Sequence, residues 1–503
     1  MFSPVSFSSV LFLLSLESWV VVSDDVCIPA TAKISPARHT YAVEGLEVSR
    51  ISFSSCHLPE LMKRDAPTFW QDMRQVSDPQ LWLWMGDNMY RDGNDINAKR
   101  LEYNKVREEE SYARHGLVSQ TEPVIPIMAC WDDHDYGYND AGSDYPCSAE
   151  SQAEWAHHVN IPPSEPQHPD SPDYRPGVYN SRMFLKPGTE EEAGVHVILL
   201  DNRSGRDPTY DKFGECKGSD TKILSDQQWA WLEEELERQS EIKIIGSGIQ
   251  VLPPTNLITR LLPEFCAHDS HNKEDNTTNT FLEAIARVGE GEEWYGVPYE
   301  MWGEVPLQRE KLLGLAQRSL NRGKTQLVMF VSGDPHWAEL MAKRMPDSEQ
   351  WGPSQVLYEV TASGVPQDWP GFYLNSNRLR DRSADHRGEG PFNQNCQFPF
   401  TYDDVIYEDC TDVDNGGVPW CAVLVDSYGN AVPTMWGNCG PVEAELAQTT
   451  FSNSSQTCSN NDYFVCTAKA NYGFIHVDWE ERRVEMSVRT PTEEEQISHT
   501  INY

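Results

Sequence analysis

The stretch VIPIMACWDDHD, residues 124–135, decides how this chain folds. Its first half is apolar and short, and carboxylate and imidazole side chains follow directly, which is typical of a buried strand that ends at a polar turn. The stretches LWLWMGDNMY at 81–90 and LVMFVSGDPH at 327–336 repeat this pattern. Polar side chains at the carboxyl ends of such strands can converge on one crevice of an α/β domain.

Oxygen and nitrogen donors that converge in this way bind divalent or trivalent metals. A single cluster is explained equally well by a turn, because Gly, Asp and Asn are common in turns. Three clusters, each behind an apolar run, favour a metal site over three unrelated turns.

The bulk composition limits the classes of partner. The chain has 503 residues, enough for about two to four domains, and its formal net charge is −38. That charge disfavours binding to nucleic acid or to anionic membranes, because phosphate backbones require a basic surface. An acidic protein that acts on phosphate esters must neutralise its substrate locally, and bound metal ions do this well.

The N-terminus predicts secretion. Residues 1–23 resemble a signal peptide, with the apolar core VLFLLSL at 10–16 and small residues before a cleavage site at Asp24. The alternative is an uncleaved anchor, although the apolar run is short for a membrane span. We expect no membrane span in the mature chain. Twelve cysteines fit an oxidising compartment, and Asn276 and Asn453 open glycosylation motifs.

Strand-like and helix-like segments alternate until about residue 385, which predicts an α/β domain. The run VHVILL at 195–200 is typical of another buried strand. The sequence SDQQ at 225–228 fits a capping box that opens an amphipathic helix, and residues 307–320 predict a second helix. Residues 140–180 are rich in Pro, Ser and His, which predicts a long surface loop or lid.

The composition changes between residues 396 and 439, where four cysteines lie among aromatic and turn residues. This is typical of a disulfide-stapled module with too small a core to fold otherwise. The opening CQFPFTY at 396–402 and the pair Trp420-Cys421 resemble the fibronectin type II family, although the Cys421 to Cys439 segment is a few residues longer than usual. A strand pattern returns at 472–479, so we expect the module to be inserted in a surface loop of the larger domain.

The fibronectin type II resemblance implies the disulfides Cys396–Cys421 and Cys410–Cys439. It also implies that an aromatic surface binds collagen, gelatin or another matrix ligand. The alternative is that most of these aromatic side chains form the small core of the module. The candidate residues for the ligand-binding surface are Phe400, Tyr407, Trp420 and Trp436.

The larger domain carries an ordered series of motifs, which resembles the PhoD-like alkaline phosphatases of the calcineurin-like metallophosphoesterases. The motifs are Ser55-Cys56, GDNMY at 86–90, WDDHD at 131–135, Asp201-Asn202-Arg203, GSGIQ at 246–250 and GDPH at 333–336. The resemblance implies an α/β fold with a two-sheet β-sandwich flanked by helices. The expected organisation is a signal peptide at 1–23, a metallophosphatase domain at 24–390 and 441–503, and the type II module at 391–440.

The resemblance also implies a site for two metals, iron(III) and calcium, with zinc, manganese and magnesium as alternatives. Asp87 takes the position of the bridging carboxylate. Cys56 and Tyr90 are anionic donors that suit trivalent iron, whereas the oxygen donors suit calcium. His336 is either a ligand or a proton carrier. The expected ligands are Cys56, Asp87, Tyr90, Asp133, Asn139, Asp334 and His336.

Two further residues have expected catalytic roles. His134 matches the histidine that protonates or stabilises the leaving group, and Arg203 could grip the phosphate through two hydrogen bonds. Each assignment has an alternative: Cys56 in a disulfide, Tyr90 in the core, and Arg203 paired with an acidic neighbour. Asn202 begins a glycosylation motif, but we expect it to be buried at the site.

The sequence therefore predicts a secreted, metal-dependent phosphohydrolase that acts on phosphate monoesters or diesters by attack of metal-activated water. One alternative keeps the enzyme and makes it a phosphodiesterase or a phospholipase D-type enzyme. The other alternative is an adhesion protein, in which an inactive phosphatase scaffold displays a collagen-binding module.

Overall fold

The structure is a computed structural model. It describes residues 26–36, 38–189, 193–207, 221–252, 300–365, 383–386, 394–395, 399–403, 405–407, 410–414, 420–422, 430–431, 436–439, 465–467, 470–490 and 496–503. The signal peptide expected at 1–23, the glycosylation motifs at Asn276 and Asn453, and Cys396 lie outside the described residues.

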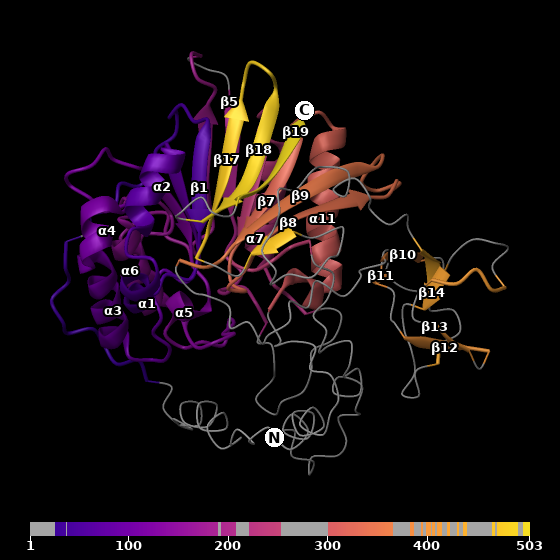
Figure 1. Cartoon of the computed structure of the whole chain (residues 1–503). Coiled ribbons are helices and arrows are strands. Elements are labelled where there is room, and N and C mark those ends of the chain that lie inside the picture. Colours follow the sequence, from indigo (N-terminus) through magenta and orange to yellow (C-terminus); the bar gives the residue numbers. More distant parts are fainter. Residues whose placement is uncertain are drawn as a thin grey trace, which may run out of the picture.

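Two β-sheets pack against each other at the centre of the larger domain (Figure 1). The first has the strand order β19-β18-β17-β1-β2-β3, and the second has the order β16-β8-β9-β7-β6-β5-β4. The first sheet comprises β1 (Arg50–Ser54), β2 (Leu81–Met85), β3 (Ile127–Cys130), β17 (Tyr472–Asp478), β18 (Arg483–Arg489) and β19 (Gln496–Asn502). The second comprises β4 (Asn180–Leu185), β5 (Ala193–Leu199), β6 (Ile242–Ser247), β7 (Leu327–Ser332), β8 (Ala338–Met345), β9 (Gln355–Ala362) and β16 (Val465–Thr467). The two-sheet α/β fold expected from the sequence is confirmed.

Parallel pairing brings the polar strand ends to one edge. Strands β1, β2 and β3 are mutually parallel, and so are β5, β6, β7 and β9. All five residues of β2 are buried, because a parallel strand is covered on both faces. The carboxyl ends of these two parallel groups therefore supply the loops in which the predicted ligands lie.

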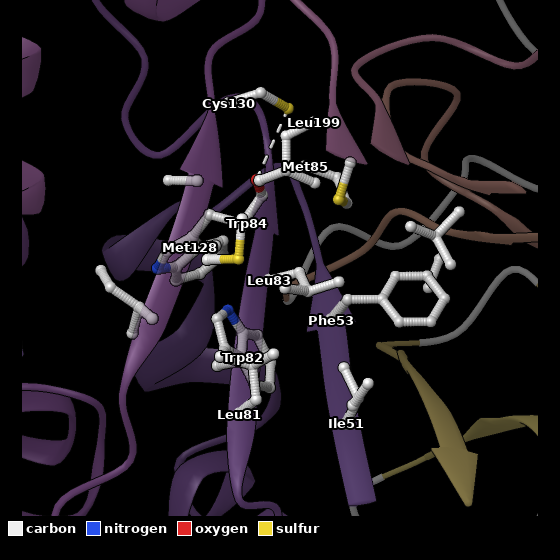
Figure 2. Packing of buried hydrophobic residues seen from close by; sticks show 14 of the residues in the cluster. Ile51, Phe53, Leu81, Trp82, Leu83, Trp84, Met85, Met128, Cys130 and Leu199 are labelled. Atoms are coloured by element: carbon white, nitrogen blue, oxygen red, sulfur yellow. Dashed lines mark hydrogen bonds between the residues drawn. The ribbon is translucent and has the colours of Figure 1, made fainter. Parts of the chain in front are cut away.

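Alternate side chains of β2 serve the two faces of the first sheet (Figure 2). Trp82 and Trp84 pack against Trp70, with ring centroids 5.3 and 6.0 Å apart. Met85 faces the second sheet, where a Cβ atom on Gly246 would lie 2.7 Å from its Cε. A side chain at position 246 would thus force the sheets apart, which explains the glycine.

Helices flank the sandwich on both sides (Figure 1). On the side of the first sheet lie α1 (Pro59–Asp65), α2 (Phe69–Ser77), α3 (Ile96–Glu108), α4 (Glu110–His115), α5 (Asp133–Tyr136) and α6 (Ser148–Val159). On the side of the second sheet lie α7 (Asp226–Glu237), the 3₁₀ helix η2 (Trp302–Glu304) and α11 (Pro306–Asn321). The predicted capping residue of α7 is confirmed, since the Ser225 hydroxyl accepts a hydrogen bond from Gln228 N at 3.1 Å.

The loop predicted for residues 140–180 is wrong in part, because α6 occupies its centre. Trp155 and Val159 are fully buried in the core, and a disulfide between Cys27 and Cys147 ties the start of this helix to the N-terminal segment. The segment is polar in composition, which led to the prediction of a loop, but its apolar residues recur at helical spacing and favour a helix.

The type II segment has its own small core, apart from the sandwich in Figure 1. Phe400 is 0% and Trp420 5% exposed, whereas Tyr407 and Trp436 are partly buried. Phe400 and Trp420 thus serve the core and leave Tyr407 and Trp436 as candidates for a ligand surface. The strands are β10 (Ser383–His386), β11 (Gln394–Asn395), β12 (Phe400–Tyr402), β13 (Val405–Tyr407), β14 (Trp420–Ala422) and β15 (Trp436–Cys439).

Two features of this segment bear on the expected boundaries and disulfides. Strand β10 pairs with β15 and precedes the expected boundary at residue 391. Cys410 and Cys421 are each disulfide-bonded. The pairing of these two cysteines with Cys439 and Cys396 stays a prediction.

A buried histidine predicts how stability depends on pH. His39 is 2% exposed; its Nδ1 donates to His158 O at 2.7 Å, and its Nε2 accepts from the Tyr112 hydroxyl at 2.5 Å. Burial, helped by the nearby charge of Arg107, lowers the pKa of His39 from 6.5 to about 3. The unfolded chain therefore binds a proton at this residue at a higher pH than the folded chain does.

Between pH 6.5 and about 3 the free energy of unfolding should fall as the pH falls. His39 alone would contribute up to about 1.4 kcal/mol per pH unit. Urea denaturation at pH 7 and pH 5 measures the change, and the variant His39→Gln, which cannot take up the proton, should show a smaller loss. An equal loss in the variant and the wild type would contradict this account.

Candidate metal centre

The predicted ligands follow strands of both sheets. Cys56 follows β1, Asp87 follows β2, Asp133 opens α5 just after β3, and Asp334 follows β7. Main-chain hydrogen bonds join these strand ends, from Cys56 N to Gly86 O at 3.4 Å and from His57 N to Asp87 O at 2.8 Å. Residues far apart in the sequence thus share one edge of the sandwich.

The backbone is left-handed at several of these residues. The φ angle is 62° at Cys56, 49° at Asp87, 81° at Asp334 and 59° at His336, and it is 60° at Asp140. Such a conformation costs a non-glycine residue about 1–2 kcal/mol. Strain of this kind is typical of functional sites, where the surrounding structure holds side chains in a required direction.

The donor atoms form three groups of three, and within each group the atoms lie within 4.8 Å of one another. Asp87 and Asp133 each belong to two of these groups, so each carboxylate is shared by two sets of donors. The groups are Cys56, Asp87 and His336; Asp87, Asp133 and His134; and Asp133, Asp140 and Glu300.

The electrostatics of these donors favour a cation. Burial, followed by the nearby negative charges, raises the pKa of the Asp87 and Asp334 carboxyls and of the Cys56 thiol well above their ordinary values. Asp87 Oδ1 and Asp334 Oδ2 are buried and have no hydrogen-bond partner in the described part of the chain. Carboxylate, thiolate and imidazole donors with unpartnered atoms fit a metal centre.

Cys56 is a free cysteine with 0% exposure. The alternative of a disulfide at this position therefore does not apply in the described structure. Tyr90, on the loop after β2, directs its hydroxyl to His336 Nε2 at 3.1 Å, and its ring packs on His134 with a centroid distance of 4.4 Å. The phenol thus lies beside the first donor group rather than in the apolar core.

His134 is held by a carboxylate that the sequence analysis missed. Its Nδ1 donates to Asp92 Oδ1 at 2.6 Å, which leaves Nε2 available to the donor group. Burial opposes its charge, but Asp133, Asp87 and Asp92 together raise the pKa of His134 well above its ordinary value. Asp92 follows the GDNMY motif by two residues, a position without a recognisable local pattern.

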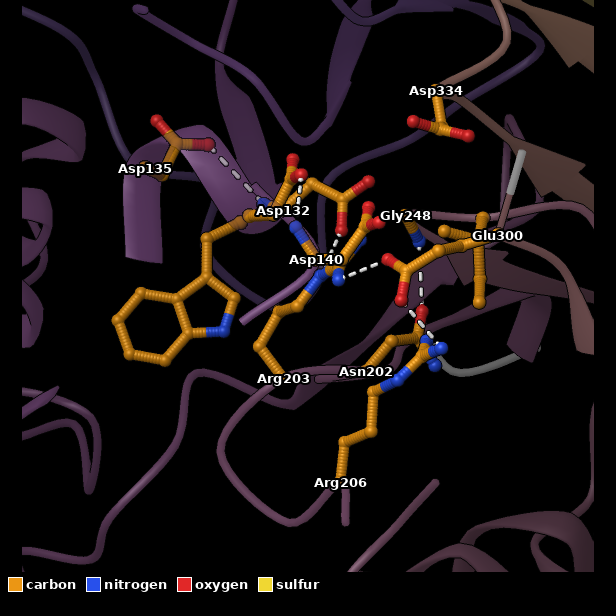
Figure 3. Close-up of polar contacts among 12 residues, drawn as sticks. Asp132, Asp135, Asp140, Asn202, Arg203, Arg206, Gly248, Glu300 and Asp334 are labelled. Carbon is orange, nitrogen blue, oxygen red and sulfur yellow. Dashed lines mark hydrogen bonds and ion pairs between the residues drawn. The ribbon is translucent and has the colours of Figure 1, made fainter. Parts of the chain in front are cut away.

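The guanidinium of Arg203 pairs with two carboxylates (Figure 3). It is 0% exposed and forms ion pairs with Asp132 and with Glu300. Glu300 also pairs with Arg206 Nη2 at 2.5 Å. Arg203 is thus paired with acidic neighbours, which was the alternative to a grip on phosphate. Its Nη2 has no partner in the described part of the chain.

Asp132, which belongs to this ion-pair group, and the adjacent Asn202 are both buried. The pKa of Asp132 is raised to about 7 by burial, against the opposing charge of Arg203. Asn202 is fully buried, as expected, and its Oδ1 accepts from Ser247 Oγ at 2.8 Å and from Gly248 N at 2.9 Å. Asn202 is therefore inaccessible to glycosylation in the folded protein.

The structure places Asn139 differently from the other expected ligands. Its side chain is exposed, whereas the adjacent Asp140 belongs to the third donor group. Asp334, another expected ligand, belongs to none of the three groups. Asp140 N donates to Asp133 Oδ2 at 2.8 Å, which bends the chain so that the Asp140 carboxylate joins Asp133 and Glu300. Neither Asp140 nor Glu300 stands at the end of an apolar run, so sequence patterns did not reveal them.

Comparisons with known proteins agree with part of this description. Residues 396–439 match the family model of the fibronectin type II domain, and the expected family of this segment is confirmed. The chain is similar to a solved structure titled "Structure of PhoD", with 12% sequence identity and a TM-score of 0.43, over 92% of this chain and 70% of that chain. The curated proteins contain no match.

A membrane anchor was also considered. Among the described residues, every helix is too short or too polar to cross a bilayer.

A glycine at the site provides a test of the packing around the donors. Gly86 precedes Asp87 with a φ of +97°, and a Cβ atom there would lie 2.5 Å from Asp132 Cβ. The variant Gly86→Ala should destabilise the fold by about 1–3 kcal/mol beyond the backbone strain, because Asp132 must move. It should also displace Asp87 and reduce the metal content of the purified protein.

Gly45→Ala is the matched control. Its φ is +82°, but nothing lies within 4 Å of the added Cβ, so it should cost only the strain of about 1–2 kcal/mol. Urea denaturation and elemental analysis measure both variants. Equal stability and metal content in the two would contradict the packing described for Gly86.

Proposed function

We propose that the larger domain is a metal-dependent phosphohydrolase that hydrolyses phosphate monoesters or diesters. One observation carries the proposal: Asp87 belongs both to the group with Cys56 and His336 and to the group with Asp133 and His134. A carboxylate shared by two adjacent donor sets is the arrangement that a two-metal hydrolase requires.

The donors divide into two kinds. Cys56, with Tyr90 and His336 beside it, forms a set with anionic donors that suits iron(III), whereas Asp133 and Asp334 are oxygen donors that suit calcium. When bound, such metals supply an activated water and offset the negative charge of the phosphoryl oxygens. The protein contributes the shared carboxylate, the fixed directions of the donors and a buried surrounding.

His134 is proposed to move a proton, which leaves Asp87 and Asp133 as the metal donors of the second group. Its imidazole is held by Asp92 at Nδ1, so its Nε2 proton can pass to the oxygen of the leaving group. The raised pKa of His134 supports this role, because the imidazole must carry the proton before the ester bond breaks.

Arg203 was expected to grip the phosphate, and its two ion pairs argue for a smaller part. Asp132 and Glu300 already offset its charge, and Glu300 also pairs with Arg206. We therefore assign most of the charge relief on the substrate to the metals, and to Arg203 only a contact through its unpartnered Nη2.

The type II segment is proposed to direct the enzyme to an extracellular matrix ligand such as collagen or gelatin, through Tyr407 and Trp436. Both side chains are partly buried at the edge of the module core, so each keeps an accessible face. Secretion is part of the same proposal, since the disulfides and this domain type suit the extracellular space.

The variant Asp87→Ala tests the proposal. It should abolish hydrolysis of aryl phosphate mono- and diesters, because both donor groups lose their shared carboxylate. Elemental analysis of the purified variant should find less metal, and circular dichroism should find an unchanged fold. The matched control is Asp78→Ala, which removes another aspartate with a left-handed backbone (φ 40°) at an exposed position. Full activity in Asp87→Ala would refute the proposed function.

The role of His134 gives a separate prediction. His134→Ala should lower kcat by about 10²- to 10⁴-fold for phenyl phosphate, whose leaving group needs a proton. The loss should be much smaller for p-nitrophenyl phosphate, whose leaving group departs as a stable anion. An equal loss for the two substrates would mean that His134 does not act as the acid.

A further inference from the structure

Two buried hydroxyl groups contact the sulfur of Cys56. Ser55 Oγ lies 3.2 Å and Ser363 Oγ 3.1 Å from Cys56 Sγ, and all three residues are 0% exposed. Ser55 lies on the loop after β1 of the first sheet, whereas Ser363 directly follows β9 of the second. The sulfur is therefore held from both sheets at once.

The second contact of each hydroxyl leaves its own hydrogen available for the sulfur. Ser55 Oγ accepts from Asp334 N at 3.2 Å, and Ser363 Oγ accepts from His336 N at 2.9 Å. In the described part of the chain, Cys56 Sγ is the other partner of each oxygen. Since a serine hydroxyl has one hydrogen to donate, both hydroxyls can donate it to the sulfur when Cys56 is a thiolate. A thiol would instead direct its hydrogen to an acceptor such as Asp87 Oδ2, 3.5 Å away, or Asp334 O, 3.6 Å away.

Two hydroxyl donors at the sulfur suit a thiolate, the form in which cysteine binds a metal. We propose that Ser55 and Ser363 are positioning residues that hold the Cys56 thiolate toward a metal and tune the metal–sulfur bond. This inference rests on the proposed metal centre and adds residues to it. Hydrogen bonds to a ligating sulfur withdraw electron density from it, which alters the properties of the bound metal.

The same two hydroxyls also hold the turn that carries Asp334 and His336. Both of these residues have left-handed backbones, so their main-chain N–H groups need a fixed partner to keep the turn in place. Gly333 permits the approach, because a Cβ atom there would lie 2.6 Å from Ser55 Oγ. The two serines thus join one thiolate and the strained turn into a single unit.

The test uses Co²⁺ alone, added to the metal-depleted full-length protein, and follows the thiolate-to-cobalt charge-transfer absorption. Ser55→Ala and Ser363→Ala each remove one donor to sulfur. The matched control is Ser54→Ala, which removes a hydroxyl that is equally buried but bonds to Ala362 O and Asn471 O. Cys56→Ser identifies the absorption band that depends on the sulfur.

The wild type and Ser54→Ala should share one band, and Cys56→Ser should lack it. In each of the other two serine variants the band should move to longer wavelength, because the sulfur holds its electrons less tightly. Co²⁺ binding should weaken by about 10- to 100-fold in these variants. A band and an affinity unchanged from Ser54→Ala in both variants would overturn the inference, as would a band that persists in Cys56→Ser.

These readouts need no turnover, so they separate the inference from the proposed function. Spectral shifts in a protein that hydrolyses no phosphate ester would support the thiolate assignment and refute the phosphohydrolase. Hydrolysis of phosphate esters together with unshifted spectra would support the phosphohydrolase and refute the thiolate assignment. Circular dichroism checks the fold of each variant, and if one does not fold the other decides the question, because each hydroxyl contacts the sulfur separately.

Discussion

Mutual repulsion among buried anions is the constraint on which the arrangement at the strand ends depends. Asp87 lies with Cys56 on one side and Asp133 on the other, and Asp334 is close enough to raise the pKa of the Cys56 thiol. Burial, with the charges of Asp133, Asp132 and Asp135, raises the pKa of Asp87 as well. A bound cation would relieve such a concentration of negative charge without protonating it.

The backbone near these donors is under strain that the rest of the fold must offset. Left-handed residues at Cys56, Asp87, Asp334 and His336 each cost free energy. The aromatic packing beneath β2 and the main-chain bonds between neighbouring strand ends hold these turns in place. The packing of the core thus offsets the free-energy cost of these left-handed turns, and the donor side chains keep their directions at the strand ends.

The cationic side chains at the site differ in how far carboxylates already offset their charge. Arg203 and Arg206 are paired with Asp132 and Glu300, so they contribute little net charge toward an anionic ligand. His134 is the exception, because three carboxylates together raise its pKa. The expected grip of Arg203 on phosphate followed from residue type alone, and residue type does not reveal which acidic partners the fold supplies.

The sequence by itself determined the strands, their polar ends, the helices at α7 and α11, and the type II segment, because these depend on local periodicity and spacing. It also indicated part of the donor chemistry, since Asp87 and Asp133 follow apolar runs, whereas Cys56 was expected from the family resemblance alone. Only the tertiary structure decided which donors share a group. Ser363 lies 307 positions from Cys56, and Glu300 lies 97 from Arg203; such partners meet only because parallel strands of two sheets end at one edge.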